Sequence, residues 1–365
     1  GHDLSAGGDV LGRVAGCARA ALAAHGLDPR APVTLLNVSE NATFLVADPV
    51  GGRSVLRVHR LGYHDERAIA SELAWMDALR EQAGVRTPRV LPARDGRRIV
   101  TVLEETVPDN TLDTERQCLR HCVRFEFLPG TEPSPDPVRG PAHFAVLGEI
   151  TARMHAHART WTRPAWFTRF SWDTGAAFGP AARWGHWRDG PGVGPAERGI
   201  LGRLERTLTA RLAAYGTGPG RFGLVHADTR LANLLTSDSG PGGGTGTAVI
   251  DFDDSGFSWY LYDLGTTVSF FEDDPGVPAL LDAWLSGYRR GGGAVGAADE
   301  AEIWTFVMLR RLLLLGWMGT HPASAGVAGL SAAYAKGSCD LAERFLSGSL
   351  ATRLTPRAAS TFHVF

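Results

Sequence analysis

The stretch that most constrains this chain covers residues 222–254 and reads FGLVHADTRLANLLTSDSGPGGGTGTAVIDFDD. Its short apolar runs, separated by polar residues and a glycine-rich turn, predict a strand, a loop, a short strand, a turn and another strand. After the first run come His226, Asp228 and Asn233, in the pattern H-x-D-x-x-x-x-N. Asp251 follows the last run. A hairpin between the two groups would bring their polar side chains to one place.

Protein kinases have the same spacing in their catalytic loop, where the Asp accepts a proton from the attacking hydroxyl and the Asn holds a metal ion. The transferred phosphoryl group is negatively charged, and Mg²⁺, which neutralises it, prefers oxygen ligands. Asn233 offers a neutral oxygen and Asp251 a charged one. The pattern therefore predicts Asp228 as catalytic base and Asn233 and Asp251 as Mg²⁺ ligands. The alternative is that these residues cap a turn and end a strand, as Asp and Asn often do.

A basic residue upstream has the surroundings of a phosphate contact. The runs VTLLNV, ATFLVAD and SVLRVHR predict three antiparallel strands, and alternation in the third places Arg57 on the face opposite Leu56 and Val58. The helix predicted over 65–83 carries Glu72. Kinases have a Lys and a Glu in these places, so Arg57 and Glu72 are predicted to pair and to bind nucleotide phosphates. The alternative is a surface Arg and a solvated Glu.

Two further segments are candidates for nucleotide binding. Ser39 and Asn41 lie in the first hairpin, where a nucleotide kinase folds a loop over the phosphates. An ordinary polar hairpin is the alternative. Residues 125–129 are predicted to form a hinge in which the backbone of Glu126 and Leu128 hydrogen-bonds the adenine edge. A plain edge strand is the alternative there.

Helical periodicity dominates after the proline-rich link 129–141. The run 257–271 is predicted as one long helix with Asp263 near its start, behind the catalytic loop. One of Arg310 and Arg311 is expected to pair with an acid and the other to be solvated or near substrate. His155 and His157 point to different sides of a helix and are interpreted as packing or polar-network residues. Other helices are predicted over 143–157, 195–215, 279–289, 300–318 and 330–346.

Composition excludes several partners. Hydrophobic residues make up 44% and charged residues 21%, as in ordinary globular proteins, and the net charge of −2 implies no surface for nucleic acid. The longest apolar run near the C-terminus, 312–318, is far shorter than the ~20 residues of a membrane span, so no membrane partner is expected. No signal peptide is recognised, which predicts a cytoplasmic protein. Its scattered cysteines are expected to be reduced: Cys17, Cys118, Cys122 and Cys339.

With these residues placed, the chain resembles the aminoglycoside phosphotransferase and choline kinase group over residues 33–346. The runs VLRVHR, SELAWMDAL, LVHADTRLANLL and VIDFDDSGFSWYLYDLGTTV carry the resemblance. It is greatest to the branch of type II homoserine kinases and stress-response kinases. The resemblance implies an α+β, bilobal, protein-kinase-like fold. Its small N-lobe, residues 1–128, would have a five-stranded antiparallel sheet and one main helix. Its C-lobe, residues 129–365, would be larger and mostly helical.

The same resemblance implies roles that match those given above for Asp228, Asn233, Asp251, Arg57 and Glu72. It adds Asp253, which would serve a second metal or the substrate. His226, from the catalytic-loop pattern, and Asp263, behind that loop, are predicted as supporting or substrate residues. Two departures matter. Arg57 replaces the usual Lys, and no A-P-E segment follows Asp251, which favours small molecules over protein substrates.

The sequence thus predicts a kinase that uses ATP or GTP with Mg²⁺ and phosphorylates a hydroxyl of a small polar molecule. Amino sugars, amino alcohols, hydroxy amino acids and antibiotic-like metabolites are the candidate acceptors. Two alternatives remain, a kinase of peptide or protein Ser/Thr hydroxyls and a nucleotide-binding pseudokinase. A group of acids would either suit a cationic acceptor or form a solvated turn. These acids are Asp253, Asp254, Glu272, Asp273 and Asp274. No oligomeric state is predicted.

Overall fold

The computed structural model describes residues 4–38, 41–104, 118–237, 246–322 and 327–350. The chain forms two compact units, neither of which is one continuous stretch. The first contains Gly1–Arg80, Arg86–Pro129 and Arg163–Thr168. The second contains Glu81–Val85, Gly130–Thr162 and Arg169–Phe365.

The first unit is built on an antiparallel sheet with the strand order β1-β2-β3-β5-β4 among the described residues. The first three strands are the predicted meander, and β5 then lies between β3 and β4. The five-stranded antiparallel sheet expected from the sequence is therefore confirmed. The strand bounds are Val33–Val38 (β1), Ala42–Asp48 (β2), Gly52–Val58 (β3), Val100–Glu104 (β4) and Cys118–Glu126 (β5).

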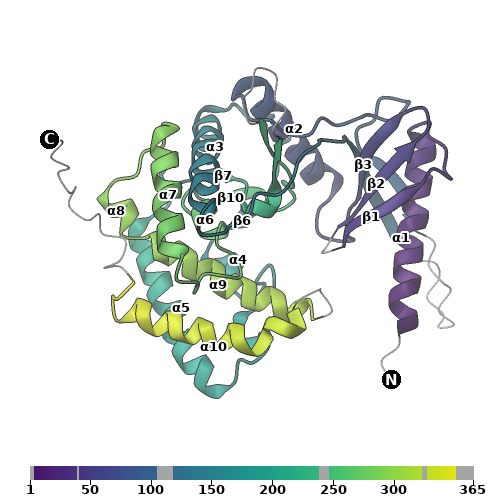
Figure 1. The fold of residues 1–365 in the computed structure, drawn as a ribbon. Coiled ribbons are helices and arrows are strands. Elements are labelled where there is room, and N and C mark those ends of the chain that lie inside the picture. The colour runs from purple at the N-terminus through teal and green to yellow at the C-terminus, as the bar shows by residue number, and fades with distance from the viewer. Residues whose placement is uncertain (1–3, 39–40, 105–117, 238–245, 323–326, 351–365) are drawn as a thin grey trace. The chain divides into compact units, whose positions relative to one another are not determined.

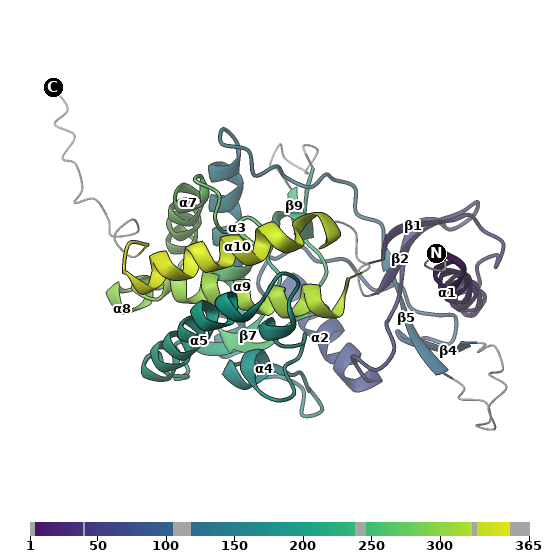
Figure 2. The ribbon, with the colours of Figure 1, turned by 90° about the horizontal axis from the view of Figure 1, so that it is seen from below.

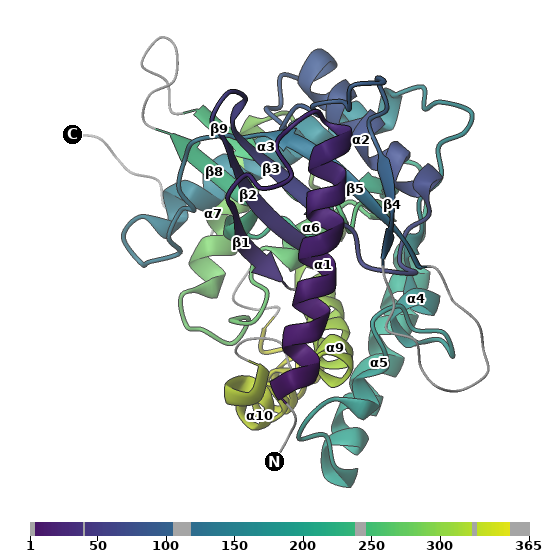
Figure 3. The ribbon, with the colours of Figure 1, turned by 90° about the vertical axis from the view of Figure 1, so that its right-hand side faces the viewer.

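Among the described residues of this sheet's unit are the helix α1 (Leu4–Ala24) and most of the helix α2 (Glu66–Gln82). Figure 3 shows α1 lying along the sheet, and its small apolar side chains join Leu56 and Val58 in one buried core. Strand alternation places Arg57 on the other face. The sheet thus has an apolar side under α1 and carries the buried guanidinium of Arg57 on its other side.

The second unit is mostly helical, and its centre is α9 (Ile303–Thr320), which is apolar almost all round and buried. Helices α5 (Pro195–Tyr215) and α10 (Val327–Leu346) pack along it (Figure 2). Helices α3 (Gly140–Thr160) and α7 (Val277–Arg290) lie side by side (Figure 1). Short helices complete this unit: α4 (Thr174–Phe178), α6 (Tyr262–Thr266) and α8 (Ala297–Glu300), with 3-10 turns η1 (Trp187–Asp189) and η2 (Leu231–Asn233).

Small strands hold the loop that carries Asp228. Strand β7 (Phe222–Val225) pairs with β10 (Gly256–Trp259), which also pairs with β6 (Ser171–Trp172). Strands β8 (Leu234–Ser237) and β9 (Gly246–Val249) form a separate antiparallel pair. The predicted order of strand, loop and two hairpin strands is confirmed, while residues 238–245 of the turn lie outside the described residues.

The prediction of one long helix over 257–271 is wrong. Residues 256–259 form β10, and only Tyr262–Thr266 is helical. The hydroxyls of Thr266, Thr267 and Ser269 each donate to a backbone carbonyl three residues earlier. Such side-chain bonds compete with helix continuation and favour a series of turns.

The helices and the cysteines can be compared with the expectations of no membrane span and of reduced thiols. None of the helices in the described part of the chain has the length and apolarity needed to cross a bilayer. Cys17, Cys122 and Cys339 are buried free thiols, in line with the expected reduced state.

Candidate active site

The loop between β7 and β8 is fixed from behind by Asp263, at the start of α6. The carboxylate accepts hydrogen bonds from the backbone N–H of Ala227 at 2.7 Å and of His226 at 3.4 Å. Ala227 has φ 69°, a left-handed conformation that few non-glycine residues adopt. The two backbone bonds to Asp263 hold this unusual turn, and the side chain that follows it belongs to Asp228.

Asp263 is in turn held by a buried chain of polar groups from α3 and α7. His155 Nε2 lies 2.7 Å from Asp263 Oδ2, and His155 Nδ1 lies 2.8 Å from the hydroxyl of Tyr288. Burial lowers the pKa of His155, although its bond to Asp263 acts in the opposite direction. The neutral imidazole therefore donates to Asp263 and accepts from Tyr288. The interpretation of His155 as a polar-network residue is confirmed.

Asp228 is almost completely enclosed by hydrogen-bond donors. Its Oδ1 accepts from Arg310 Nη2 and from Arg230 Nε, both at 2.8 Å. Its Oδ2 accepts from Asn233 Nδ2 at 2.9 Å and from Arg230 Nη2 at 3.4 Å. Burial alone would raise the pKa of this carboxyl, but Arg230 and Arg310 outweigh it and lower the pKa to about 2. Asp228 is therefore ionised at neutral pH.

Arg310 reaches this loop from the middle of α9 and is 2% exposed. Besides Asp228, it donates to the carbonyl of Ala227 at 3.2 Å, to the Tyr262 hydroxyl at 3.0 Å and to Ser269 Oγ at 2.9 Å. No local sequence pattern predicts this contact, because Arg310 and Asp228 are 82 residues apart.

Arg311 points to the other side of α9 and forms its own ion pair. Its Nη1 lies 2.6 Å from Glu272 Oε2, and Tyr334 donates to the same carboxylate. Successive residues on a helix point about 100° apart, so the two arginines meet different acids. Neither arginine is solvated, since both are buried and paired with acids, and the expectation that one of them lies near substrate stays a prediction. Glu272 is likewise buried and paired, while Asp273 and Asp274 are exposed.

Asn233 and Asp251 lie at the same end of the β8–β9 pair. The backbone N–H of Ile250 donates to the carbonyl of Asn233 at 2.9 Å, next to the Leu234–Val249 pair, and Asp251 follows with φ 57°. His226 ties the two segments together, because its Nδ1 accepts from the N–H of Asp228 at 3.1 Å and its Nε2 donates to the Ile250 carbonyl at 3.0 Å. The structure thus brings the predicted base and the predicted metal ligands together.

The chemistry of these side chains fits Mg²⁺. Asn233 uses its amide nitrogen on Asp228, and its Oδ1 accepts no hydrogen bond from any described residue. Asp251 is partly exposed and supplies an anionic oxygen. One carboxylate and one amide oxygen form a small set of hard ligands, and Mg²⁺ commonly binds few protein groups and completes its shell with phosphate and water. Asp253 adjoins this pair, because its N–H donates to Asp251 Oδ1 at 3.3 Å.

In the sheet unit, Arg57 and Glu72 form a buried ion pair, with Arg57 Nη1 2.7 Å from Glu72 Oε1. The alternative of a surface Arg and a solvated Glu is wrong, since the residues are 8% and 0% exposed. Asn41 Oδ1 accepts from the N–H of Arg60 at 3.0 Å, so this side chain fixes the start of the segment after β3. Ser39 lies outside the described residues.

One backbone N–H of the predicted hinge already donates a hydrogen bond within the protein. The N–H of Glu126 donates to the carbonyl of Arg89 at 2.9 Å, and Glu126 Oε1 accepts from the N–H of Arg89 at 3.0 Å. The strand that ends here, β5, lies inside the sheet, so the edge-strand alternative is wrong. The Glu126 carbonyl and the Leu128 backbone stay predictions for the adenine contact.

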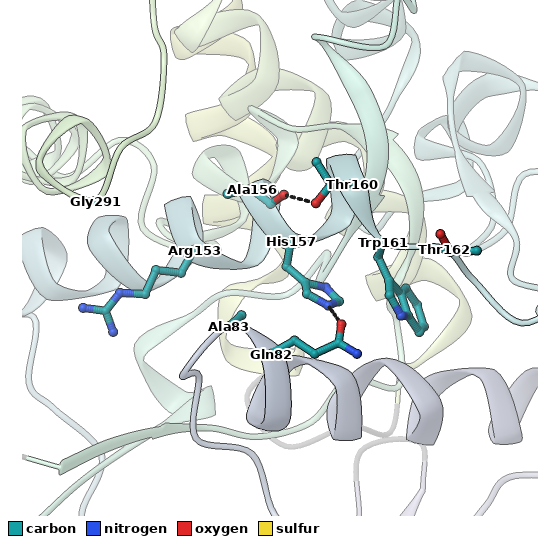
Figure 4. Close-up of a pocket in the computed structure, with 9 residues that line it drawn as sticks. All are labelled: Gln82, Ala83, Arg153, Ala156, His157, Thr160, Trp161, Thr162 and Gly291. Carbon is teal, nitrogen blue, oxygen red and sulfur yellow. Dashed lines mark hydrogen bonds between the residues drawn. The ribbon is translucent and has the colours of Figure 1, made fainter.

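A cavity of about 610 Å³ lies elsewhere in the helical unit, at the C-terminal end of α3 (Figure 4). Figure 4 shows His157 reaching toward Gln82, whose Oε1 lies 2.8 Å from His157 Nε2. None of the residues predicted above to bind nucleotide or metal lines it. The cavity is lined by Gln82, Ala83, Arg153, Ala156, His157, Thr160, Trp161, Thr162 and Gly291.

These features together define a protein-kinase-like phosphotransferase. They are a five-stranded sheet with a buried Arg–Glu pair, a helical unit, and a loop and hairpin that bring Asp and Asn side chains together. The model of the phosphotransferase enzyme family (APH) matches residues 33–300, and the chain belongs to this family. The expected relationship to this group is confirmed, while the branch of homoserine and stress-response kinases stays a prediction.

Solved structures agree with the family. A microcompartment-associated aminopropanol kinase is 47% identical, with 93% of this chain and 99% of that chain covered and a TM-score of 0.81. An amicoumacin kinase in complex with AMP-PNP and Ca²⁺ is 20% identical, with 91% and 95% covered and a TM-score of 0.69. A choline/ethanolamine kinase family protein from Mesorhizobium loti is 18% identical, with 93% and 97% covered and a TM-score of 0.58. No curated protein sequence matches.

These similarities establish the reaction class. The chain is a phosphotransferase, and its neighbour of 47% identity is an aminopropanol kinase. The expected enzyme class is confirmed, and nucleotide binding follows from it.

Proposed function

We propose that this chain transfers the γ-phosphoryl group of ATP, bound with Mg²⁺, to the hydroxyl of a small amino alcohol. The observation that carries the acceptor class is the 47% identity to an aminopropanol kinase over 93% of the chain. The gathering of Asp228, Asn233 and Asp251 supports the chemistry. Among the acceptors that the sequence left open, an amino alcohol is therefore favoured over amino sugars, hydroxy amino acids and antibiotic-like metabolites.

In this proposal each charged group has a separate task. Asn233 and Asp251 would hold the metal ion, which neutralises charge on the phosphates. Arg57, kept in place by Glu72, would contact the phosphates of the nucleotide. Asp228 would accept a hydrogen bond from the acceptor hydroxyl and then its proton, while the acceptor oxygen bonds to the γ-phosphorus and the bond to the β,γ-bridging oxygen breaks.

A carboxylate with a pKa of about 2 is a weak base. It suffices here because bonding to the acceptor is little advanced in a loose phosphoryl-transfer transition state, so positioning contributes more than base strength. Asp228 would therefore act chiefly by orienting the hydroxyl oxygen toward phosphorus. Asp263 and His226 would support it by fixing the loop.

An acceptor screen tests the proposal. Release of ADP or GDP would be measured with aminopropanol, ethanolamine, choline, homoserine, an aminoglycoside and a Ser-containing peptide, with ATP and GTP in turn. We expect the highest kcat/KM for an amino alcohol with ATP, and far less for propanol, which matches aminopropanol but lacks the amine. Turnover of the peptide or the aminoglycoside alone would overturn the acceptor class.

The role of Asp228 is tested separately by Asp228→Asn. This variant is expected to bind nucleotide almost as the wild type does and to lose turnover by at least about 10³-fold, because the base and its charge are gone. Asp340→Asn, an exposed carboxylate on α10, is the matched control and should be fully active. Comparable turnover in the Asp228 variant would remove the base from the mechanism.

A further inference from the structure

The carboxylate of Asp228 has no room for a substrate in this structure. Its two oxygens accept four hydrogen bonds from described residues, two on each oxygen. An ionised carboxylate offers about four lone-pair sites, so all of them are in use. An acceptor hydroxyl can bind Asp228 only after one of these donors has moved.

The donors differ in how firmly they are held. Arg310 is buried and has three further partners. Asn233 is buried too, and it also donates to the backbone carbonyl of Asp228 at 2.8 Å. Moving either would leave buried polar groups unpaired, which is costly. Arg230 differs, because its side chain is 35% exposed and both of its hydrogen bonds within the described residues go to Asp228.

Arg230 is also the cation that the chemistry requires next to the base. Its pKa is raised, chiefly by Asp228 and to a smaller extent by Asp251, so the guanidinium lies within the field of both acids. A phosphoryl group in transfer would lie between a base at Asp228 and a metal at Asp251. A guanidinium is planar and donates two parallel hydrogen bonds to phosphoryl oxygens, which suits it to this place.

We propose that Arg230 is a catalytic residue that covers Asp228 in the resting enzyme and moves to the transferring phosphoryl group when both substrates are bound. The inference rests on the function proposed above. In the reaction, the acceptor oxygen bonds to phosphorus, the bond to the bridging oxygen of the leaving diphosphate breaks, and the proton passes to Asp228. Arg230 donates to the equatorial oxygens throughout and is unchanged at the end. Its departure vacates the lone pairs that the acceptor hydroxyl needs.

The test is Arg230→Ala with chemical rescue. Removing one preorganised donor from a transition state typically costs about 10²–10³ in kcat, and we expect a loss of this size. KM for the acceptor should stay level or fall, since nothing then covers the base. Millimolar guanidinium should restore part of the rate with saturation, and Arg230→Lys should keep an intermediate rate. The urea midpoint should change little, because a partly exposed ion pair contributes little stability.

A control and two outcomes decide the inference. Arg203→Ala, an exposed arginine on α5, should have wild-type kcat and no response to guanidinium. Wild-type or higher kcat in Arg230→Ala would overturn the proposal, because Arg230 would then only cover the base. Loss of kcat that guanidinium does not restore would overturn it as well. If Asp228→Asn is inactive in either case, only the role of Arg230 fails, whereas an active Asp228→Asn removes the proposed base itself.

Discussion

Replacing Arg310 with Met separates the stability of the site from its catalytic geometry. Met keeps the apolar stem of the side chain but removes the guanidinium and its bonds to Asp228, Ala227, Tyr262 and Ser269. Removing one partner of a buried ion pair costs about 3–5 kcal/mol. Arg230 and Asn233 still pair with Asp228, so we expect the lower end, about 3 kcal/mol.

Arg311→Met is the matched control on the same helix. It leaves Glu272, which is 1% exposed, with the Tyr334 hydroxyl as its remaining side-chain partner among the described residues. We therefore expect a loss of stability near the upper end of this range, about 5 kcal/mol. Both variants should thus unfold at lower urea concentration. Arg311 points about 100° around α9 from Arg310 and has no hydrogen bond to Asp228 among the described residues, so the kcat of folded Arg311→Met should match the wild type.

Activity then distinguishes the two arginines. Without Arg310, Asp228 and the left-handed turn at Ala227 lose a fixed support, and a shift of about 1 Å in a reacting group can cost about 10²-fold. Urea denaturation followed by tryptophan fluorescence gives the folded fraction, and kcat is measured per folded molecule. The reasoning fails if folded Arg310→Met turns over as fast as the wild type, or if Arg311→Met loses as much kcat.

Three other predictions concern pH, packing and the support of the loop. Burial lowers the pKa of His155 in the folded protein, so as pH falls below about 6.5 this side chain is protonated in the unfolded chain before it is protonated in the folded one. The contribution of His155 to stability is therefore complete above that pH and is lost as pH drops through it. The urea midpoint should therefore be lower at about pH 5.5 than at about pH 7.5, with a smaller difference in His155→Gln, and an equal difference would contradict this. Gly287→Ala should lower the melting temperature, at a cost of about 1–3 kcal/mol, because its Cβ would meet the Ala145 carbonyl where α7 touches α3. At Gly199 in α5 a Cβ would meet open space, so Gly199→Ala should stabilise the protein by about 0.5–1 kcal/mol. The packing argument is refuted if both substitutions change the melting temperature in the same direction. In Asp263→Asn, one carboxylate oxygen becomes an NH₂ group, so the side chain can accept only some of its hydrogen bonds from the loop backbone and from His155. We expect kcat to fall by about 10²-fold with little change in nucleotide affinity. An unchanged kcat would count against the role of Asp263 in supporting the loop.

Features set by local signals could be predicted from the sequence. Helix α5 begins at Pro195, which suits a first helical turn, and ends before Gly216, whose φ is 80°. Strand alternation correctly placed Arg57 on the face away from Leu56 and Val58, and the helix predicted next carries its partner. The spacing of Asp228 and Asn233 likewise lies within one loop, so their proximity needed no distant contact.

Features set by distant contacts could not be predicted. The run after Gly256 is apolar enough for a helix or a strand, and pairing with β7 decides for the strand. Arg310 and Arg311 read alike in sequence, and only the positions of Asp228 and Glu272 around α9 show that both are paired. No local pattern links His155 to Asp263, 108 residues further along.

The central claim is that Asn233 and Asp251 hold the metal that Asp228 needs beside it. The dependence of phosphoryl transfer on free Mg²⁺ tests this most directly, measured in the wild type, Asn233→Ala, Asp251→Ala and the control Asp340→Asn. Loss of even an outer partner of a metal ligand typically costs about 10–100-fold in metal affinity. We predict that both ligand variants need at least that much more Mg²⁺ for half-maximal rate, whereas the control does not. Unchanged Mg²⁺ dependence in Asp251→Ala would contradict the account.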